Sequence, residues 1–192
     1  MTEDPLCDSA ITNALSSIRK EAHLPNQIFT QAWDEYLFFE SYMMFDAIFI
    51  ETKNIILNEE EYSKIAVINL GNLPNDSDRE PRSICLDKET TFPEYISILK
   101  GDGSPLNWMF LMDRYVCASN KGNWCIYCEK ENDIAVLATR HAFPASVLLN
   151  LRNLLKANSI KTIDNSKMDH KFFDFNKLVS SWKAALVANY GH

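Results

Sequence analysis

Several motifs that carry catalysis are missing from this 192-residue sequence. No GxSxG nucleophile elbow occurs, and the stretch 101–105, which holds two glycines, is not followed by the Lys-Ser/Thr pair of a phosphate-binding loop. The four histidines are scattered, without the HxH or HExxH spacing of a metal site. We therefore expect no catalytic residue, no cofactor and no metal, and a protein that is not an enzyme.

Long apolar runs are also missing. The strongest one, residues 36–50, is interrupted by Glu40 and Asp46 and is shorter than the ~20 residues that a membrane span needs. The first nine residues carry three acids and no base, the opposite of a secretory signal. We expect a cytoplasmic protein that does not enter a membrane.

Cysteine occurs five times, an odd number, at irregular spacings. Because cytosolic thiols stay reduced, we expect all five to be free and mostly buried. Cys125 and Cys128 form a Trp-Cys-x-x-Cys pattern typical of thioredoxin-like sites, so a small thiol-redox enzyme stays open as an alternative. The pattern lies in an expected strand rather than at a helix N-terminus, so the two side chains should point to opposite faces.

A zinc site would have to join that cysteine pair to Cys117 and His141. Structural zinc sites usually bring two ligand pairs at regular spacing, and only one pair is present. The spacing therefore argues against zinc.

Positive charge is scarce in the first third of the chain. Residues 1–62 hold 12 acids and 3 bases, whereas residues 143–192 hold 3 acids and 7 bases, within a net charge of −7. An acidic first third argues against nucleic acid as a direct partner, because phosphates bind Lys and Arg. It suits a basic protein partner, although an ordinary solvated surface is the alternative explanation.

What the sequence does contain is a clear β-meander. Three stretches rich in Val, Ile, Tyr, Trp and Phe predict strands at 107–118, 123–130 and 134–140. The connectors 119–123 and 131–133 consist of turn-forming residues and are short enough for hairpins. We therefore predict a central antiparallel sheet around residues 107–140.

Helices are expected on both sides of this sheet region in the sequence, so the fold class is α+β. One domain over residues 1–192 would hold a helical part at 8–57, a sheet region at 64–140 and C-terminal helices at 143–190. Within the sheet region, 64–70 and an edge segment at 83–86 are further expected strands, and 91–100 is an expected helix that ends at Gly101.

Residues 27–57 contain no Gly or Pro and predict one long, largely buried helix. On a helical wheel Glu40 and Glu51 fall on its apolar side. They could line a pocket as a carboxylate pair, could each pair with Lys or Arg, or could signal that the helix breaks near Asp46.

Asp113 and Arg114 are the charged pair within a strand of the meander. We expect a bidentate carboxylate–guanidinium pair between them. Catalysis by Asp113 is a weaker hypothesis than this ion pair, because no base or electrophile can be assigned beside it.

The meander resembles cytoplasmic immunity proteins of bacterial contact-dependent growth-inhibition and polymorphic-toxin systems. The residues that carry the resemblance are Trp108, Asp113-Arg114-Tyr115, the turn 119–122, the strand 123–129 and Ile134-Ala135-Val136-Leu137. The resemblance implies tight, stoichiometric binding that blocks a toxin domain, with no turnover. It carries no binding residue over, because these families do not share one. An intracellular adaptor of another pathway would share the binding role.

Many such toxins resemble basic nucleases, for which an acidic patch would mimic the nucleic-acid substrate. We expect the toxin-binding patch on the polar face of the second helix and its connector, with loop acids as second choices, and we expect a monomer. The patch residues are Asp34, Glu35, Glu59, Glu60 and Glu61, followed by Asp76, Asp78, Glu80 and Asp102.

Overall fold

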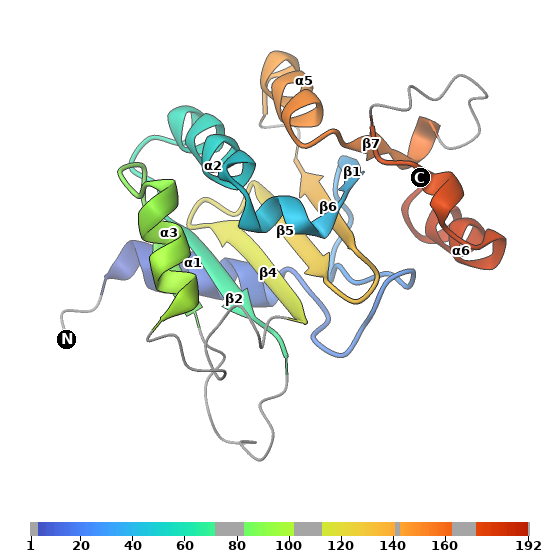
Figure 1. Ribbon diagram of the computed structural model, residues 1–192, viewed down its shortest axis with the longest axis horizontal. Coiled ribbons are helices and arrows are strands. Elements are labelled where there is room, and N and C mark those ends of the chain that lie inside the picture. The colour runs from blue at the N-terminus through green and yellow to red at the C-terminus, as the bar shows by residue number, and fades with distance from the viewer. Residues whose placement is uncertain (1–3, 72–82, 102–112, 141–142, 163–171, 192) are drawn as a thin grey trace.

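A seven-stranded antiparallel sheet with helices on both faces forms the fold in a computed structural model, which describes residues 4–71, 83–101, 113–140, 143–162 and 172–191 (Figure 1). The strand order is β3-β2-β4-β5-β6-β1-β7. The strands are β1 (Glu35–Phe39), β2 (Ile65–Asn69), β3 (Ser83–Leu86), β4 (Arg114–Ser119), β5 (Trp124–Glu129), β6 (Ile134–Thr139) and β7 (Asn158–Ser159). The α-helices are α1 (Pro5–Ser16), α2 (Ala47–Glu59), α3 (Phe92–Lys100), α5 (Ala145–Leu154) and α6 (Ser180–Tyr190). The predicted α+β class is confirmed.

The predicted meander occupies the middle of this sheet as β4, β5 and β6. Each pairs with the next in antiparallel register, so that Ile126 lies opposite Cys117 on one side and Leu137 on the other. The part of the first predicted strand before residue 113 lies outside the described residues. The strands predicted at 64–70 and 83–86 are also present as β2 and β3, and β3 forms the sheet edge as expected.

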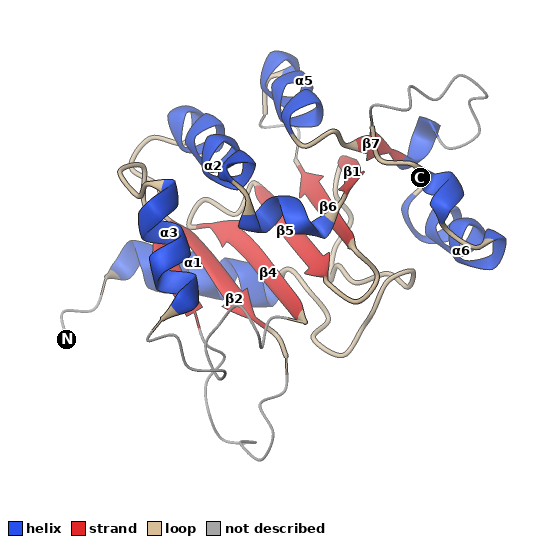
Figure 2. Cartoon of the chain, in the orientation of Figure 1, coloured by secondary structure: helices blue, strands red, loops and turns tan. Residues whose placement is uncertain are grey.

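Both faces of the sheet are buried, and each faces its own core. In Figure 2, α2, α3 and α5 lie on the near side of the sheet, whereas α1 lies behind it. Alternate strand residues divide accordingly: Ile126 belongs to the core under α2, α3 and α5, and Tyr127 belongs to the core that includes α1 and α6. Two covered faces explain why the central strands are apolar throughout rather than alternating.

The single helix predicted at 27–57 is wrong. The segment instead forms β1, the short 3₁₀ helix η1 (Ser41–Phe45) and α2, which begins after Asp46. Asp46 is the N-cap, and its side chain accepts a hydrogen bond from the backbone N–H of Ile48 at 3.2 Å. Residues 36–39 are aromatic and apolar, and the open edge of β6 offers them a hydrogen-bonding partner, so tertiary pairing outweighs helical periodicity.

Other helix limits agree in part. The capping box at Thr91 and Glu94 and the end at Gly101 confirm the helix predicted at 91–100. The first helix begins at Pro5, before the helical part expected from residue 8, because Asp4 caps it. The short 3₁₀ helix η3 (Phe175–Lys177) precedes the last helix, α6. Another short 3₁₀ helix, η2 (Ile160–Thr162), follows β7. Within the described residues, no helix is long and apolar enough to cross a bilayer.

One buried cation holds α2 to the segment that leads into α3. The side chain of Lys53 is fully buried, and its Nζ donates to the backbone carbonyls of Asp87, Lys88 and Thr90, the last at 2.8 Å. Three carbonyl acceptors replace the water that this ammonium loses on burial. Burial nevertheless lowers the pKa of Lys53.

Lys53→Met should therefore lower the free energy of unfolding by about 2 kcal/mol, because it keeps the apolar stem but leaves three carbonyls without their charged donor. Urea unfolding measures this change. Lys88→Met is the matched control, because Lys88 is exposed and next to the same turn, and should change stability by less than about 0.5 kcal/mol. Equal effects of the two variants would contradict the anchoring role.

Candidate functional site

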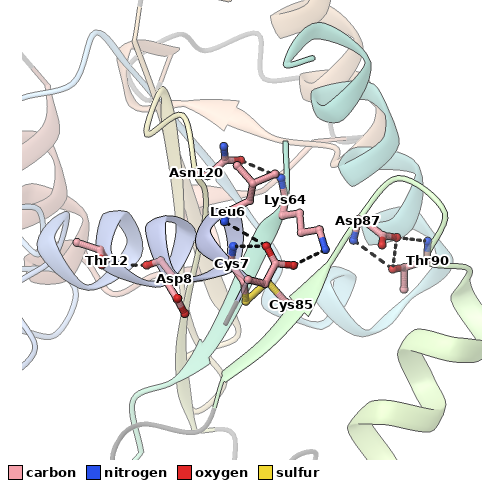
Figure 3. The surroundings of a disulfide bond; sticks show 10 residues. Leu6, Cys7, Asp8, Thr12, Lys64, Cys85, Asp87, Thr90 and Asn120 are labelled. Atoms are coloured by element: carbon pink, nitrogen blue, oxygen red, sulfur yellow. Dashed lines mark hydrogen bonds and ion pairs between the residues drawn. A yellow bond between two sulfur atoms is a disulfide. The ribbon is translucent and has the colours of Figure 1, made fainter. Parts of the chain in front are cut away.

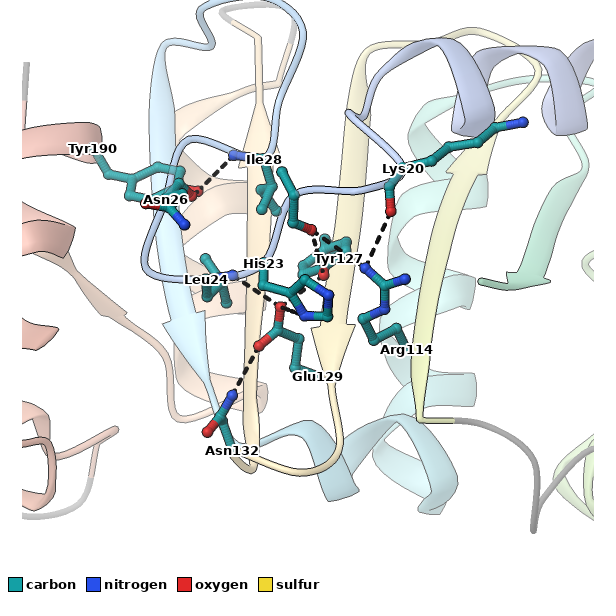
Figure 4. Close-up of polar contacts among 11 residues, drawn as sticks. Lys20, His23, Leu24, Asn26, Ile28, Arg114, Tyr127, Glu129, Asn132 and Tyr190 are labelled. Carbon is teal, nitrogen blue, oxygen red and sulfur yellow. Dashed lines mark hydrogen bonds and ion pairs between the residues drawn. The ribbon is translucent and has the colours of Figure 1, made fainter. Parts of the chain in front are cut away.

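A polar pocket of about 750 Å³ opens at the end of the sheet where β4 begins and β5 ends (Figure 4). It combines the loop after α1, the end of β2 and the turn between β5 and β6. The described lining residues are His23, Gly71, Asp113, Arg114, Glu129, Lys130 and Glu131. Six of these seven side chains are polar or charged, so the pocket is suited to a polar group rather than an apolar ligand.

Glu129 is the buried centre of this pocket, with only 2% of its surface exposed. Its Oε1 accepts hydrogen bonds from the Leu24 backbone N–H at 2.8 Å and from the Tyr127 hydroxyl at 2.7 Å. Its Oε2 accepts one from Asn132 Nδ2 at 2.9 Å. Nδ1 of the largely exposed His23 lies 3.5 Å from Oε1. The carboxylate therefore joins β5, the β5–β6 turn and the loop after α1.

The Arg114 guanidinium is held by backbone carbonyls and not by the predicted pairing with Asp113. Its Nη1 instead donates to the backbone carbonyls of Lys20 at 3.1 Å and Ala22 at 3.4 Å. Successive residues at a strand start point to opposite faces, so the two side chains diverge. Tyr127 donates to the same Ala22 carbonyl as Arg114. Burial and the adjacent Glu129 carboxylate raise the pKa of the Tyr127 hydroxyl.

The polar groups of the pocket are largely used to hold the backbone. Glu129 accepts a hydrogen bond from the Leu24 backbone N–H, and Arg114 donates one to the Lys20 carbonyl, both in the loop after α1. These side-chain groups are therefore already occupied by partners within the protein. Among the lining residues that the structure describes there is no Ser, Thr or Cys that could act as a nucleophile. The arrangement can bind a polar group at its rim, where His23, Lys130 and Glu131 are accessible.

The expected placement of Asp34 and Glu35 on the polar face of a second helix is wrong, because residues 35–39 form β1. Glu35 lies opposite Thr139, and Thr139 lies opposite Trp124, so Glu35 and Trp124 are two strands apart, about 10 Å at the usual strand spacing. Glu60 binds Trp124, which places Glu59 to Glu61 at this same end of the sheet. Sheet register rather than a helix face thus brings the two groups to one end. The second-choice acids Asp76, Asp78, Glu80 and Asp102 lie outside the described residues.

Glu60 does not belong to the exposed surface, and its place in the patch is corrected. Only 6% of it is exposed, and its Oε2 accepts a hydrogen bond from Trp124 Nε1 at 3.3 Å. Its Oε1 is buried without a hydrogen-bond partner. Burial raises the pKa of this carboxyl group. The sequence Glu59-Glu60-Glu61 does not reveal which of its members points inward.

Its neighbours point outward. Glu59 and Glu61 are exposed, and Tyr62 is 87% exposed, far more than any other large hydrophobic residue described. The backbone of Tyr62 has φ +53°, in the left-handed region that a large side chain rarely adopts. The buried Glu60 thus holds a turn that exposes the Tyr62 ring next to the Glu59 and Glu61 carboxylates. Sequence reasoning missed Tyr62, because nothing local signals its exposure.

Glu40 and Glu51 do not form a pocket pair. Glu40 forms an ion pair with Lys177, and Glu51 is exposed on α2. The alternatives of cation pairing for Glu40 and of a helix break near Asp46 are therefore the ones confirmed.

Cys125 and Cys128 are both fully buried, and they face opposite cores as expected. Burial raises the pKa of both thiols, so the thiolate that redox exchange requires is disfavoured. Their opposed directions also prevent them from sharing one metal ion or forming a disulfide with each other. These features argue against the thiol-redox alternative.

The expectation that all five cysteines are free is wrong. Cys7 in α1 and Cys85 in β3 form a disulfide bond (Figure 3). Their positions are 78 residues apart, and no spacing rule in the sequence links them. Cys117, Cys125 and Cys128 are free and buried.

Comparison with known proteins finds no relative. No family model matches the chain, and neither the curated proteins nor the solved structures include a match.

Glu129→Gln should lower the free energy of unfolding by about 1.5 kcal/mol. The amide oxygen can keep part of the hydrogen bonding, but charge-assisted bonds become neutral ones. Urea unfolding tests this, with Glu131→Gln as the control, since Glu131 is an exposed glutamate in the adjacent turn. A loss below about 0.5 kcal/mol for both variants would contradict the role of Glu129 as a structural anchor.

Glu60→Gln should raise the free energy of unfolding at pH 7 by about 1 kcal/mol, because it removes a charge from a desolvated position. A carboxyl group with a raised pKa in the folded state makes folding less favourable as pH rises above its ordinary value of 4.5. The gain should therefore disappear below that pH, where the wild-type carboxyl is protonated in both states. Urea unfolding at pH 4 and pH 7 measures it, with Glu59→Gln as the exposed control. A Glu60→Gln protein less stable than wild type at pH 7 would contradict the argument.

Proposed function

We propose that this protein is an inhibitor of the immunity type, which binds a toxin domain one to one and blocks it by steric and electrostatic occlusion, without turnover. The observation that carries the proposal is the turn formed by residues 59–62. Its Tyr62 is highly exposed, and tyrosine is enriched at binding surfaces because it buries a large area at low entropic cost. The resemblance of the meander to immunity proteins supports the same role.

The charge of this region selects the chemistry of the partner. Glu59 and Glu61 precede Tyr62 in the turn, and Asp34 and Glu35 lie at the same end of the sheet. Carboxylates of this number favour a basic partner surface and accelerate encounter with it. A nuclease domain, whose surface binds phosphates, has that character, and occupying its substrate-binding surface would inhibit it.

The rigidity of the turn also favours binding. Glu60 is held under the turn by Trp124, and the Glu60 backbone N–H donates to the Ile56 carbonyl at 3.0 Å. A surface that is already ordered loses less entropy on binding than a flexible loop. An adaptor of another pathway would use the same surface, and the biological readout below separates it from an immunity protein. The Cys7–Cys85 disulfide gives independent information about the compartment in which the protein meets its partner.

The proposal predicts a gene for a secreted toxin directly upstream, and the experiment is co-expression with the C-terminal domain of that protein, followed by size exclusion and a growth assay. We expect a one-to-one complex and rescue of growth. Tyr62→Ala should weaken binding by about tenfold to a hundredfold, as expected for an aromatic at the centre of an interface. Glu59→Lys combined with Glu61→Lys should slow association and weaken its dependence on salt.

The matched control is Glu51→Lys combined with Glu89→Lys, which makes the same change of charge at two exposed sites away from the turn. It should leave the complex unchanged. Glu60 is left intact in every variant, so that loss of binding is not confused with loss of the turn. Binding that is insensitive to both turn variants would remove the turn from the interface, and a complex without growth rescue would favour an adaptor. No complex at all would refute the proposal.

A further inference from the structure

The Cys7–Cys85 disulfide lies at a corner where the N-terminal helix meets the edge of the sheet (Figure 3). Cys7 is in the first turn of α1, and Cys85 is in β3, whose described strand pairing is with β2. The two Cα atoms are 5.9 Å apart, within the range that a disulfide spans without backbone movement. The bond therefore connects two elements that the fold itself brings together.

The helix reaches this corner by packing on β2 and β4. Ala10 and Ala14 are completely buried against the sheet, and their small side chains allow the helix to approach closely. Asp4 caps α1 and also forms an ion pair with Lys64, which precedes β2. These contacts hold α1 over the inner strands. The disulfide extends that hold by one strand to β3 at the sheet edge.

An edge strand is the part of a sheet most exposed to fraying and to pairing with other chains. β3 has only four residues, and among them only Leu86 is fully buried. Few buried contacts mean a low local stability. A covalent link to a well-packed helix would compensate for that weakness.

The distribution of the cysteines separates this pair from the other three. Cys7 and Cys85 are both partly exposed, so a disulfide-carrying oxidant can reach them, whereas Cys117, Cys125 and Cys128 are completely buried. In the folded chain, oxidation is thus directed to Cys7 and Cys85, and no other pairing of the five cysteines competes with it. The overall reaction converts the two thiols to one disulfide and reduces the oxidant's disulfide to a dithiol, with two electrons and two protons transferred.

We propose that this protein matures in an oxidising compartment, where Cys7 and Cys85 form a structural disulfide that fastens α1 to the β3 edge. Disulfides of this kind persist outside the reducing cytosol and are rare within it. This inference replaces the cytoplasmic location expected from the sequence. It does not depend on the immunity role and would hold if that role were refuted. If both proposals hold, the protein meets the toxin domain in the oxidising compartment, before a nuclease reaches nucleic acid.

The first test counts thiols in the protein as it occurs in its own cells. Cells that make the chain naturally are treated with N-ethylmaleimide and lysed in denaturant that contains the same reagent, so that the buried free thiols also react, and the mass of the protein is then measured. Three adducts are expected, one for each free cysteine. Five adducts would show that both members of the pair are reduced in the cell, which would overturn the proposal.

A second test asks whether the bond is structural. Dithiothreitol should lower the folding equilibrium constant of the purified oxidised protein by about a thousandfold, the scale that loop-closure entropy predicts for opening a loop of 78 residues. The double variant Cys7→Ser with Cys85→Ser should not respond to dithiothreitol, and it controls for effects of the reductant on the rest of the chain. Hydrogen exchange in β3 should accelerate on reduction. An unchanged equilibrium constant would exclude a structural role. If the double variant does not fold, the wild-type titration alone decides.

Discussion

Burial of the central strands on both faces is the constraint from which the rest of the structure follows. Every residue of β5 and β6 is buried, so each face must be covered by other elements. Helices α2, α3 and α5 cover one face, and α1, α6 and the loop after α1 contribute to the core on the other. The connecting segments must then be held close to the sheet, where their backbone groups lose contact with water and need partners in the protein.

Two buried charged side chains meet that need: Lys53 binds the carbonyls before α3, and Glu129 binds the loop after α1. A third, Glu60, instead anchors the turn after α2 to the side chain of Trp124. Lys53 and Glu129 each have at least three hydrogen-bonding groups around the charge, whereas Glu60 keeps one oxygen without a partner. The difference makes Glu60 the least satisfied of the three and places its turn in an energetically less favourable environment.

The same anchors bear on function. In the His23–Glu129 pocket, the most polar side chains support the backbone, which leaves the rim for contact with a ligand. At the opposite end of the sheet, Glu60 is the anchor, and its side chain is buried. Its neighbours Glu59, Glu61 and Tyr62 are exposed and therefore accessible to a partner. A structural carboxylate and a binding surface can thus occupy consecutive positions. Charge alone does not distinguish them.

Local signals in the sequence were enough to predict the α+β class, the three-strand meander, β2, β3 and the helix at 92–100, namely β-forming residues, short turns and a capping box. Strand geometry was likewise enough to predict that Cys125 and Cys128 face opposite cores. The strand at residues 35–39 could not be predicted in this way, because its formation depends on tertiary pairing with β6. The tertiary structure alone decided which of three consecutive glutamates is buried and which two cysteines meet across 78 residues. Contacts between distant segments set each of these outcomes, and local sequence does not encode them.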